Sequence, residues 1–248
     1  MPYRKEKFAN GEIYHIILRA IDNNLIFKDI DDYYRGIFSI YEFNNVNPVT
    51  IQSRRKIRNA FKNLSKKADR HPMSIQPPDF IDDREKMIEI LAFCFMPNHI
   101  HLLVRQLIDN GISKFMQKTG IGLGKYFNTK YKRKGHVFQD SFGVVHIEND
   151  NQFMATISYI FTNPVALIES GWKEKGIRNH STEEIIKFLE GYKWSSYQDC
   201  IGIKNFPTVT ERSFLFKAMG EKAGLKEVVK DWIEHKKDVA KYANLFLE

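Results

Sequence analysis

The apolar residues of this chain fall into short strand-like runs and into longer stretches with helical spacing. Residues 12–21 (EIYHIILRAI) and 142–148 (FGVVHIE) are rich in β-branched side chains, which is typical of strands. Residues 88–96 (IEILAFCFM) are nearly all apolar, as expected of a central strand that is buried on both faces. The Pro-Asn pair at 97–98 predicts a tight turn, after which residues 99–105 return as a neighbouring antiparallel strand.

Between these runs the apolar residues recur with a helical period. Asp31 is in position to cap a helix that ends near residues 44–45, and residues 112–131 have helical spacing that three glycines interrupt. Another helix is expected over residues 150–162. It should end there, because Pro164 keeps the residue before it out of the α conformation. The first helix has the apolar stripe Tyr34, Ile37, Phe38 and Tyr41, and the glycines are Gly120, Gly122 and Gly124. This mixture predicts the α+β class, an antiparallel sheet with helices packed on it.

Positive charge is concentrated in two segments. Residues 54–70 hold eight lysines and arginines against one aspartate, and their apolar residues have helical spacing, which predicts a basic amphipathic helix. Residues 125–139 (KYFNTKYKRKGHVFQ) alternate cations with aromatic rings, as a groove for single-stranded nucleic acid requires. A solvated charged face and ordinary core packing are the alternative explanations. The cations predicted to contact nucleic-acid phosphates are Arg54, Arg55, Arg58, Lys62, Lys125, Lys130, Lys132, Arg133 and Lys134.

The composition narrows the classes of function. The 248 residues are 43% hydrophobic and carry a net charge of +8, which favours a folded protein with a polyanionic partner, most often nucleic acid. The two cysteines, Cys94 and Cys200, form no CxxC pair and argue against a disulfide scaffold or a zinc–cysteine site. The sequence shows neither a signal peptide nor a run of about 18 apolar residues, so we expect a cytoplasmic protein without a membrane segment.

Two histidines open the strand that is predicted to follow the turn. Side chains two residues apart in a strand point to the same face, roughly 6.6 Å apart along the chain, so His99 and His101 can converge on one metal ion. A hydrogen-bonded core or surface histidine is the more ordinary explanation of either residue. Structural zinc normally has four nitrogen or sulfur ligands, which the nearby sequence does not supply. An exchangeable Mg²⁺ or Mn²⁺ ion, or another transition metal, therefore fits the pair better.

The helix expected over residues 150–162 has two different faces. Its apolar side consists of Phe153, Ile157 and Ile160. A separate polar stripe at i, i+4, i+7 and i+11 consists of Gln152, Thr156, Tyr159 and Asn163. Tyr159 is therefore predicted to lie off the apolar face, with Asn163 one turn beyond it. A tyrosine at the edge of an amphipathic helix is the ordinary alternative.

These motifs together resemble those of a known family. MPNHIHLLV matches the His-hydrophobic-His motif of HUH enzymes, and SYIFTNPV matches the Tyr-Ile-x-x-Asn-Pro-Val pattern of single-tyrosine HUH transposases, particularly the REP-associated tyrosine transposases. YHIILRAIDNNLIF, KRKGHVFQDSF and KWSSY also look like theirs, so the resemblance runs from about residue 8 to 202. It implies a ferredoxin- or RRM-like HUH catalytic fold over residues 1–165, with a basic insertion at about 45–87, and a mostly helical C-terminal extension over 166–248.

The resemblance also implies a chemistry. His99 and His101 would ligate a divalent ion, Mg²⁺ or Mn²⁺, with the amide oxygen of Asn163 as the third ligand. Tyr159 would cleave single-stranded DNA near hairpins, forming a 5′-phosphotyrosine and releasing a 3′-hydroxyl that can later rejoin strands. The metal matters because a phenol with a pKa of about 10 is a poor nucleophile. Further histidines that could support the site are His15, His136 and His146.

Three functions remain open at this point. The first is a metal-dependent DNA strand transferase, and the second is a hairpin DNA-binding protein that has lost catalysis. A pure binder needs no set of two histidines, a tyrosine and an asparagine, which favours the enzyme. The third is an HUH nickase of replication or conjugation, but the chain is short for one with a helicase domain and has Asn163, not a second tyrosine, four residues after Tyr159. The DNA target and the oligomeric state, monomer or homodimer, stay open.

Overall fold

A computed structural model describes residues 7–49, 82, 84–219 and 222–234 of the chain. The predicted basic helix at 54–70, with Arg54, Arg55, Arg58 and Lys62, lies outside the described residues. The strands are β1 (Ile13–Arg19), β2 (Ile88–Met96), β3 (His99–Gln106) and β4 (Gly143–Ile147). The helices are η1 (Ile21–Asn23), α1 (Ile30–Glu42), α3 (Gly111–Lys130), α4 (Asp150–Thr162), η2 (Asn163–Leu167), α5 (Trp172–Lys175), α6 (Thr182–Gly191), α7 (Tyr197–Cys200), α8 (Ser213–Met219) and α9 (Lys222–Glu234).

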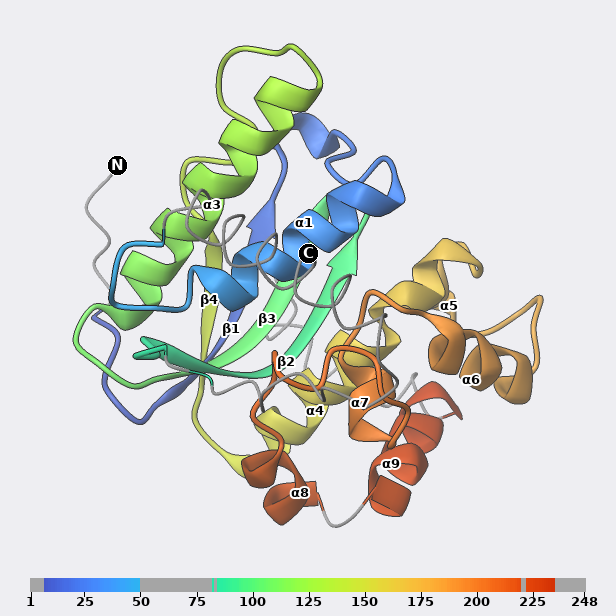
Figure 1. Cartoon of the computed structure of the whole chain (residues 1–248). Coiled ribbons are helices and arrows are strands. Elements are labelled where there is room, and N and C mark those ends of the chain that lie inside the picture. Colours follow the sequence, from blue (N-terminus) through green and yellow to red (C-terminus); the bar gives the residue numbers. More distant parts are fainter. Residues whose placement is uncertain (1–6, 50–81, 83, 220–221, 235–248) are drawn as a thin grey trace, which may run out of the picture.

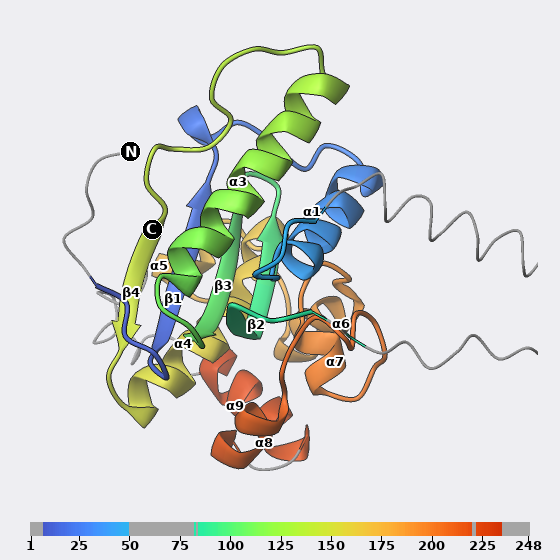
Figure 2. The same ribbon diagram turned by 60° about the vertical axis from the view of Figure 1, so that its left-hand side comes forward.

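The strands form one antiparallel sheet in the order β2-β3-β1-β4 (Figure 1). The tight turn predicted at 97–98 joins β2 to β3, and β3 then pairs along its length with β1. Helices α1 and α3 lie side by side over one face of the sheet, while α4 and the later helices lie on the other (Figure 2). This arrangement confirms the predicted α+β class, and its strand order is that of a ferredoxin-like sheet.

Each face of the sheet has its own buried core. On the α1/α3 side, side chains such as Ile100 and Leu102 of β3 pack against both helices. On the other side, α4 packs against the sheet near Leu103 of β3. Helices of the C-terminal region cover α4 in turn, and their Trp172 and Val229 are buried in the same cluster. Helix α4 is therefore enclosed from two sides. The proposed division of the chain at residue 165 stays a prediction.

The KWSSY segment closes an edge of the sheet. The N–H of Phe95 in β2 donates to the carbonyl oxygen of Trp194 at 2.8 Å, and the N–H of Phe93 donates to Ser196 Oγ at 2.9 Å. Residues 193–196 thus satisfy backbone groups of β2 that would otherwise lie on an exposed edge. The segment links the C-terminal helices to the strand that precedes the histidine pair.

Details of the first helix differ from the prediction. Asp29, not Asp31, is its N-cap: the carboxylate of Asp29 accepts the Asp32 N–H, and the carboxylate of Asp32 accepts the Asp29 N–H. This reciprocal box satisfies two backbone donors, so it fixes the start of the helix. Of the predicted apolar stripe Ile37 is buried, whereas the ring of Tyr34 is exposed. None of the described helices is long and apolar enough to cross a lipid bilayer.

Helix α3 runs without a break through Gly120, Gly122 and Gly124, so the predicted interruption of the helix by these three glycines is wrong. A Cβ at Gly122 would lie 2.2 Å from Cε2 of Phe43, whereas among the described residues nothing beyond the adjacent helix backbone lies within 4 Å of a Cβ at Gly120. We expect Gly122→Ala to lower the free energy of unfolding by about 1–3 kcal/mol through overpacking. Gly120→Ala is the matched control and should raise it by about 0.5–1 kcal/mol, because alanine favours helix. Urea unfolding measures both, and equal changes would contradict the close packing.

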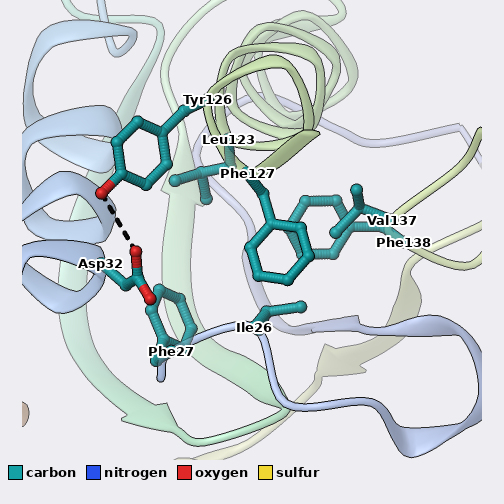
Figure 3. A pocket seen from close by; sticks show the side chains of 8 residues that line it. All are labelled: Ile26, Phe27, Asp32, Leu123, Tyr126, Phe127, Val137 and Phe138. Carbon is teal, nitrogen blue, oxygen red and sulfur yellow. Dashed lines mark hydrogen bonds between the residues drawn. The ribbon is translucent and has the colours of Figure 1, made fainter. Parts of the chain in front are cut away.

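A small, mostly apolar pocket lies between α1 and α3 (Figure 3). It is lined by Ile26, Phe27, Asp32, Leu123, Tyr126, Phe127, Val137 and Phe138. Its apolar lining belongs to the core on the α1/α3 side, which is the face of the sheet that His99 and His101 do not share. The pocket is therefore separate from the site described next.

Candidate active site

Strand β3 places the two predicted histidines on the face of the sheet that α4 covers. His101 is fully buried and His99 is 8% exposed, while Ile100 between them points into the opposite core. The ring centroids of the two histidines are 4.7 Å apart. Both imidazoles thus lie on one side of the sheet, as their spacing predicts.

Helix α4 brings Tyr159 and Asn163 to the same place. The helix begins after Asn149, whose side chain accepts the N–H of Gln152. The predicted polar stripe is buried from Thr156 onward, whereas Gln152 in the first turn is half-buried: Tyr159 is 2% and Asn163 1% exposed. The Tyr159 ring centroid lies 5.5 Å from that of His101, and Asn163 Nδ2 lies 3.0 Å from His101 Nε2. One chain therefore supplies the histidine pair, the tyrosine and the asparagine.

His15 supports His101 from the neighbouring strand. Its Nε2 lies 3.1 Å from His101 Nδ1, and the residue is fully buried. A contact at Nδ1 leaves Nε2 of His101 directed toward Asn163, so His15 can fix the tautomer and orientation of the ring. The other two candidate histidines lie elsewhere: His146 contacts Glu12 at 2.8 Å and lies with its ring centroid 5.0 Å from that of Tyr14, and His136 is exposed.

Burial controls the protonation of the site. It lowers the pKa of His99 to about 3, and it holds the pKa of His101 well below the usual range, with nearby positive charges adding to the effect. Both imidazoles are therefore neutral near pH 7. Burial also raises the pKa of Tyr159 above its ordinary value, although its hydrogen bond with Asn163 and the charge of Arg19 oppose the shift. The phenol is thus protonated and needs nearby positive charge to react.

The donor set fits a divalent metal ion. Neutral imidazole is the form that ligates metals, and two such rings lie together here. The Asn163 amide can present its oxygen instead of its nitrogen after half a turn, because the two groups have nearly the same shape. Within the described parts of the chain no group of three or more His, Cys, Asp or Glu side chains is arranged to hold a metal. A site built on these residues would therefore use the amide as its third protein ligand.

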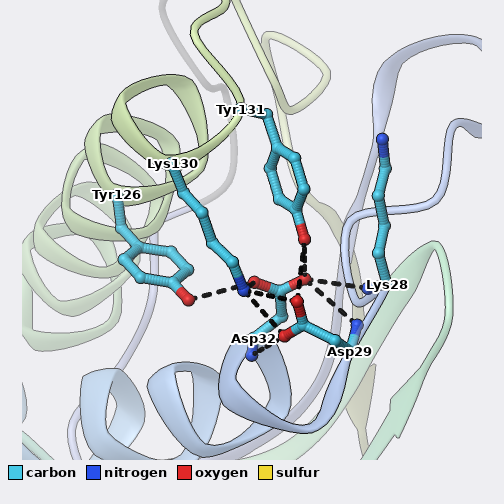
Figure 4. A network of polar contacts seen from close by, with 6 residues as sticks. All are labelled: Lys28, Asp29, Asp32, Tyr126, Lys130 and Tyr131. Atoms are coloured by element: carbon cyan, nitrogen blue, oxygen red, sulfur yellow. Dashed lines mark hydrogen bonds and ion pairs between the residues drawn. The ribbon is translucent and has the colours of Figure 1, made fainter.

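The predicted DNA-contacting cations of the 125–139 segment differ in their surroundings. Lys125, Lys132, Arg133 and Lys134 are exposed. Lys130 instead lies with its ammonium 2.7 Å from carboxylate oxygens of Asp29 and of the buried Asp32 (Figure 4). Tyr131 also donates to Asp32, at 2.6 Å. These contacts join the end of α3 to the start of α1. Phosphate binding by the five cations of this segment stays a prediction.

Two cations at the site, Arg19 and Lys173, were not predicted from the sequence. Lys173 Nζ donates to Tyr159 Oη at 3.4 Å and lies 5.3 Å from the ring centroid. Arg19 stands opposite His99 in the β1–β3 register. Their charges act on the pKa of His99. Lys173 lies in none of the motifs quoted from the sequence, and Arg19 lies in YHIILRAIDNNLIF without any local sign of a role at the site. Only the packing of β1 and α5 brings the two cations there.

Comparison with known proteins supports the resemblance. The model of a family described as "Transposase IS200 like" matches residues 82–163. This segment resembles an IS200-like transposase. It runs from just before β2 to Asn163, the first residue of η2, so it contains His99, His101, Tyr159 and Asn163 but ends before Lys173.

A solved structure of a REP-associated tyrosine transposase bound to a REP hairpin is similar to this chain at 15% sequence identity. The match covers 86% of this chain and 96% of that one, with a TM-score of 0.45. No curated protein matches the chain.

Proposed function

We propose that this protein is a divalent-metal-dependent transposase that cleaves and rejoins single-stranded DNA near hairpins through a 5′-phosphotyrosine. One observation carries the proposal. Tyr159, His101 and Asn163 meet in a buried cluster, and all lie within the segment that matches the IS200-like transposases. The nearness of a phenol, two imidazoles and an amide supports the proposal, because metal-assisted phosphoryl transfer needs a hydroxyl nucleophile beside metal-ligating atoms.

Each residue has a part in the proposed reaction. His99, His101 and Asn163 would hold Mg²⁺ or Mn²⁺, which supplies positive charge to the scissile phosphate when bound. Tyr159 Oη attacks phosphorus and the bond to the 3′ oxygen breaks, which leaves a 5′-phosphotyrosine and a 3′-hydroxyl. One phosphate ester replaces another, so the step needs no ATP. His15 keeps His101 in the orientation that directs Nε2 toward Asn163.

The covalent intermediate provides the test. Labelled single-stranded oligonucleotides that carry palindromes from the flanks of the gene are mixed with the protein and Mn²⁺ or Mg²⁺, then separated on a denaturing gel. We expect label on the protein with metal and none after chelation. Tight hairpin binding without any adduct would favour the catalytically silent hairpin-binding protein instead.

The exposed cations after α3 should contribute to DNA affinity. We expect the double substitution Lys132→Gln and Lys134→Gln to weaken hairpin binding. It should also reduce the slope of log K against log salt by about 0.7 for each lost contact with a single strand. Fluorescence anisotropy at several salt concentrations measures both. Lys130→Gln is the matched control: it should lower the melting temperature, because it breaks contacts with Asp29 and Asp32. Unchanged affinity of the double variant would remove these residues from the DNA surface.

A further inference from the structure

A cation from the C-terminal region reaches the proposed nucleophile. Lys173 belongs to α5, beyond the segment that matches the transposase family. Its Nζ is 3.4 Å from Tyr159 Oη, the atom that would attack phosphorus. The same ammonium lies 5.3 Å from the centroid of the tyrosine ring. It therefore approaches both the hydroxyl and the aromatic ring of one side chain.

The surrounding structure holds Lys173 in this position. The adjacent Trp172 is 1% exposed and anchors α5 in the core that contains α4. Before α5, the buried carboxylate of Glu169 accepts hydrogen bonds from the backbone and side chain of Asn179, at 3.0 and 2.6 Å. His180 Nδ1 lies 2.9 Å from the same carboxylate. The segment that contains α5 is thus held by hydrogen bonds between its two ends. Its backbone therefore keeps Lys173 next to Tyr159.

We propose that Lys173 is a further catalytic residue, the group that exchanges a proton with Tyr159 Oη. This inference rests on the proposed strand-transfer function. In cleavage, the neutral amine takes the phenol proton as the Oη–phosphorus bond forms and the bond to the 3′ oxygen breaks; that oxygen takes a proton from water. In rejoining, the 3′-hydroxyl attacks phosphorus and loses its proton to water. The Oη–phosphorus bond breaks, and the Lys173 ammonium returns a proton to Oη.

The charge environment suits this exchange. Burial, together with the charge of Arg19 on β1, lowers the pKa of Lys173 to about 8. Cys94 on β2 and Glu174 on α5 act in the opposite direction. Both the amine and the ammonium are therefore populated near neutral pH, which is the condition for an efficient acid–base group.

Amine rescue tests the inference. With Lys173→Ala, we expect the single-turnover rate of cleavage at saturating hairpin DNA to fall roughly 10²–10⁴-fold, while hairpin affinity stays that of the wild type. Added ethylammonium should restore the rate in proportion to its concentration. Tetramethylammonium, which has the same charge but no N–H, should not. Lys175→Ala is the matched control, an exposed lysine on the same helix that should keep the wild-type rate.

The outcomes separate this inference from the proposed function. If wild type forms no adduct, the function fails and the role of Lys173 fails with it. If wild type cleaves and Lys173→Ala cleaves as fast, only the role of Lys173 is overturned. The same holds if Lys173→Ala cleaves more slowly and no amine restores the rate. Should Lys173→Ala not fold, as judged by its melting curve, Lys173→Met keeps the length of the side chain. The same loss is then expected with Lys173→Met, and a wild-type rate would contradict the role.

Discussion

Tyr159→Phe is expected to abolish the covalent protein–DNA adduct while hairpin binding is retained. The substitution removes only Oη, the proposed nucleophile, and keeps a ring that is 2% exposed within the core. Packing is therefore preserved, and the loss should appear in the chemistry. We expect cleavage to fall on the order of 10⁴-fold or more, as when other covalent nucleophiles are removed. The denaturing gel measures the adduct, and anisotropy measures hairpin binding.

The control for this experiment is another buried tyrosine. Tyr197 is 1% exposed and belongs to the same core cluster, so Tyr197→Phe makes the same chemical change away from the histidines. It should keep the adduct. An adduct that survives Tyr159→Phe would show that another residue attacks the DNA. Loss of the adduct in both variants would point to a general effect on the core instead.

His101→Gln is expected to abolish metal binding and, with it, cleavage. The imidazole lies between His15 and Asn163, so the substitution removes one proposed ligand and breaks the contact that orients it. Titration calorimetry with Mn²⁺ measures the affinity without DNA or activity. His15→Gln provides a graded comparison, because loss of a residue that only orients a ligand typically lowers affinity by roughly 10–100-fold. His101→Gln should have the larger effect.

A histidine outside the site serves as the matched control for the metal experiment. His146 is exposed and contacts Glu12 and Tyr14, so His146→Gln should leave Mn²⁺ affinity unchanged. If His101→Gln binds Mn²⁺ as wild type does, the histidine pair is not the metal site. If the wild type still cleaves DNA after chelation, cleavage by Tyr159 does not depend on the metal.

Local pattern was enough to predict much of the framework. A continuous apolar run, a Pro-Asn turn and a second run predicted β2 and β3 at nearly their observed bounds, because strand formation and turn geometry depend on adjacent residues. The period of two placed His99 and His101 on one face, and the helical period placed Tyr159 and Asn163 on one stripe of α4. These statements concern neighbours in sequence, so the sequence itself determines them.

Only the tertiary structure decided which residues pack against the histidine face of β3 and the polar stripe of α4. The polar stripe of α4 is buried against the histidines because helices of the C-terminal region cover its apolar side, which no local pattern reports. His15 reaches His101 across 86 positions of the chain, and Lys173 reaches Tyr159 from a helix outside the recognised motifs. Lys130, chosen from the sequence for its charge, is held by Asp29 and Asp32 of another helix. Such contacts depend on how elements pack, and periodicity along the chain carries no information about that packing.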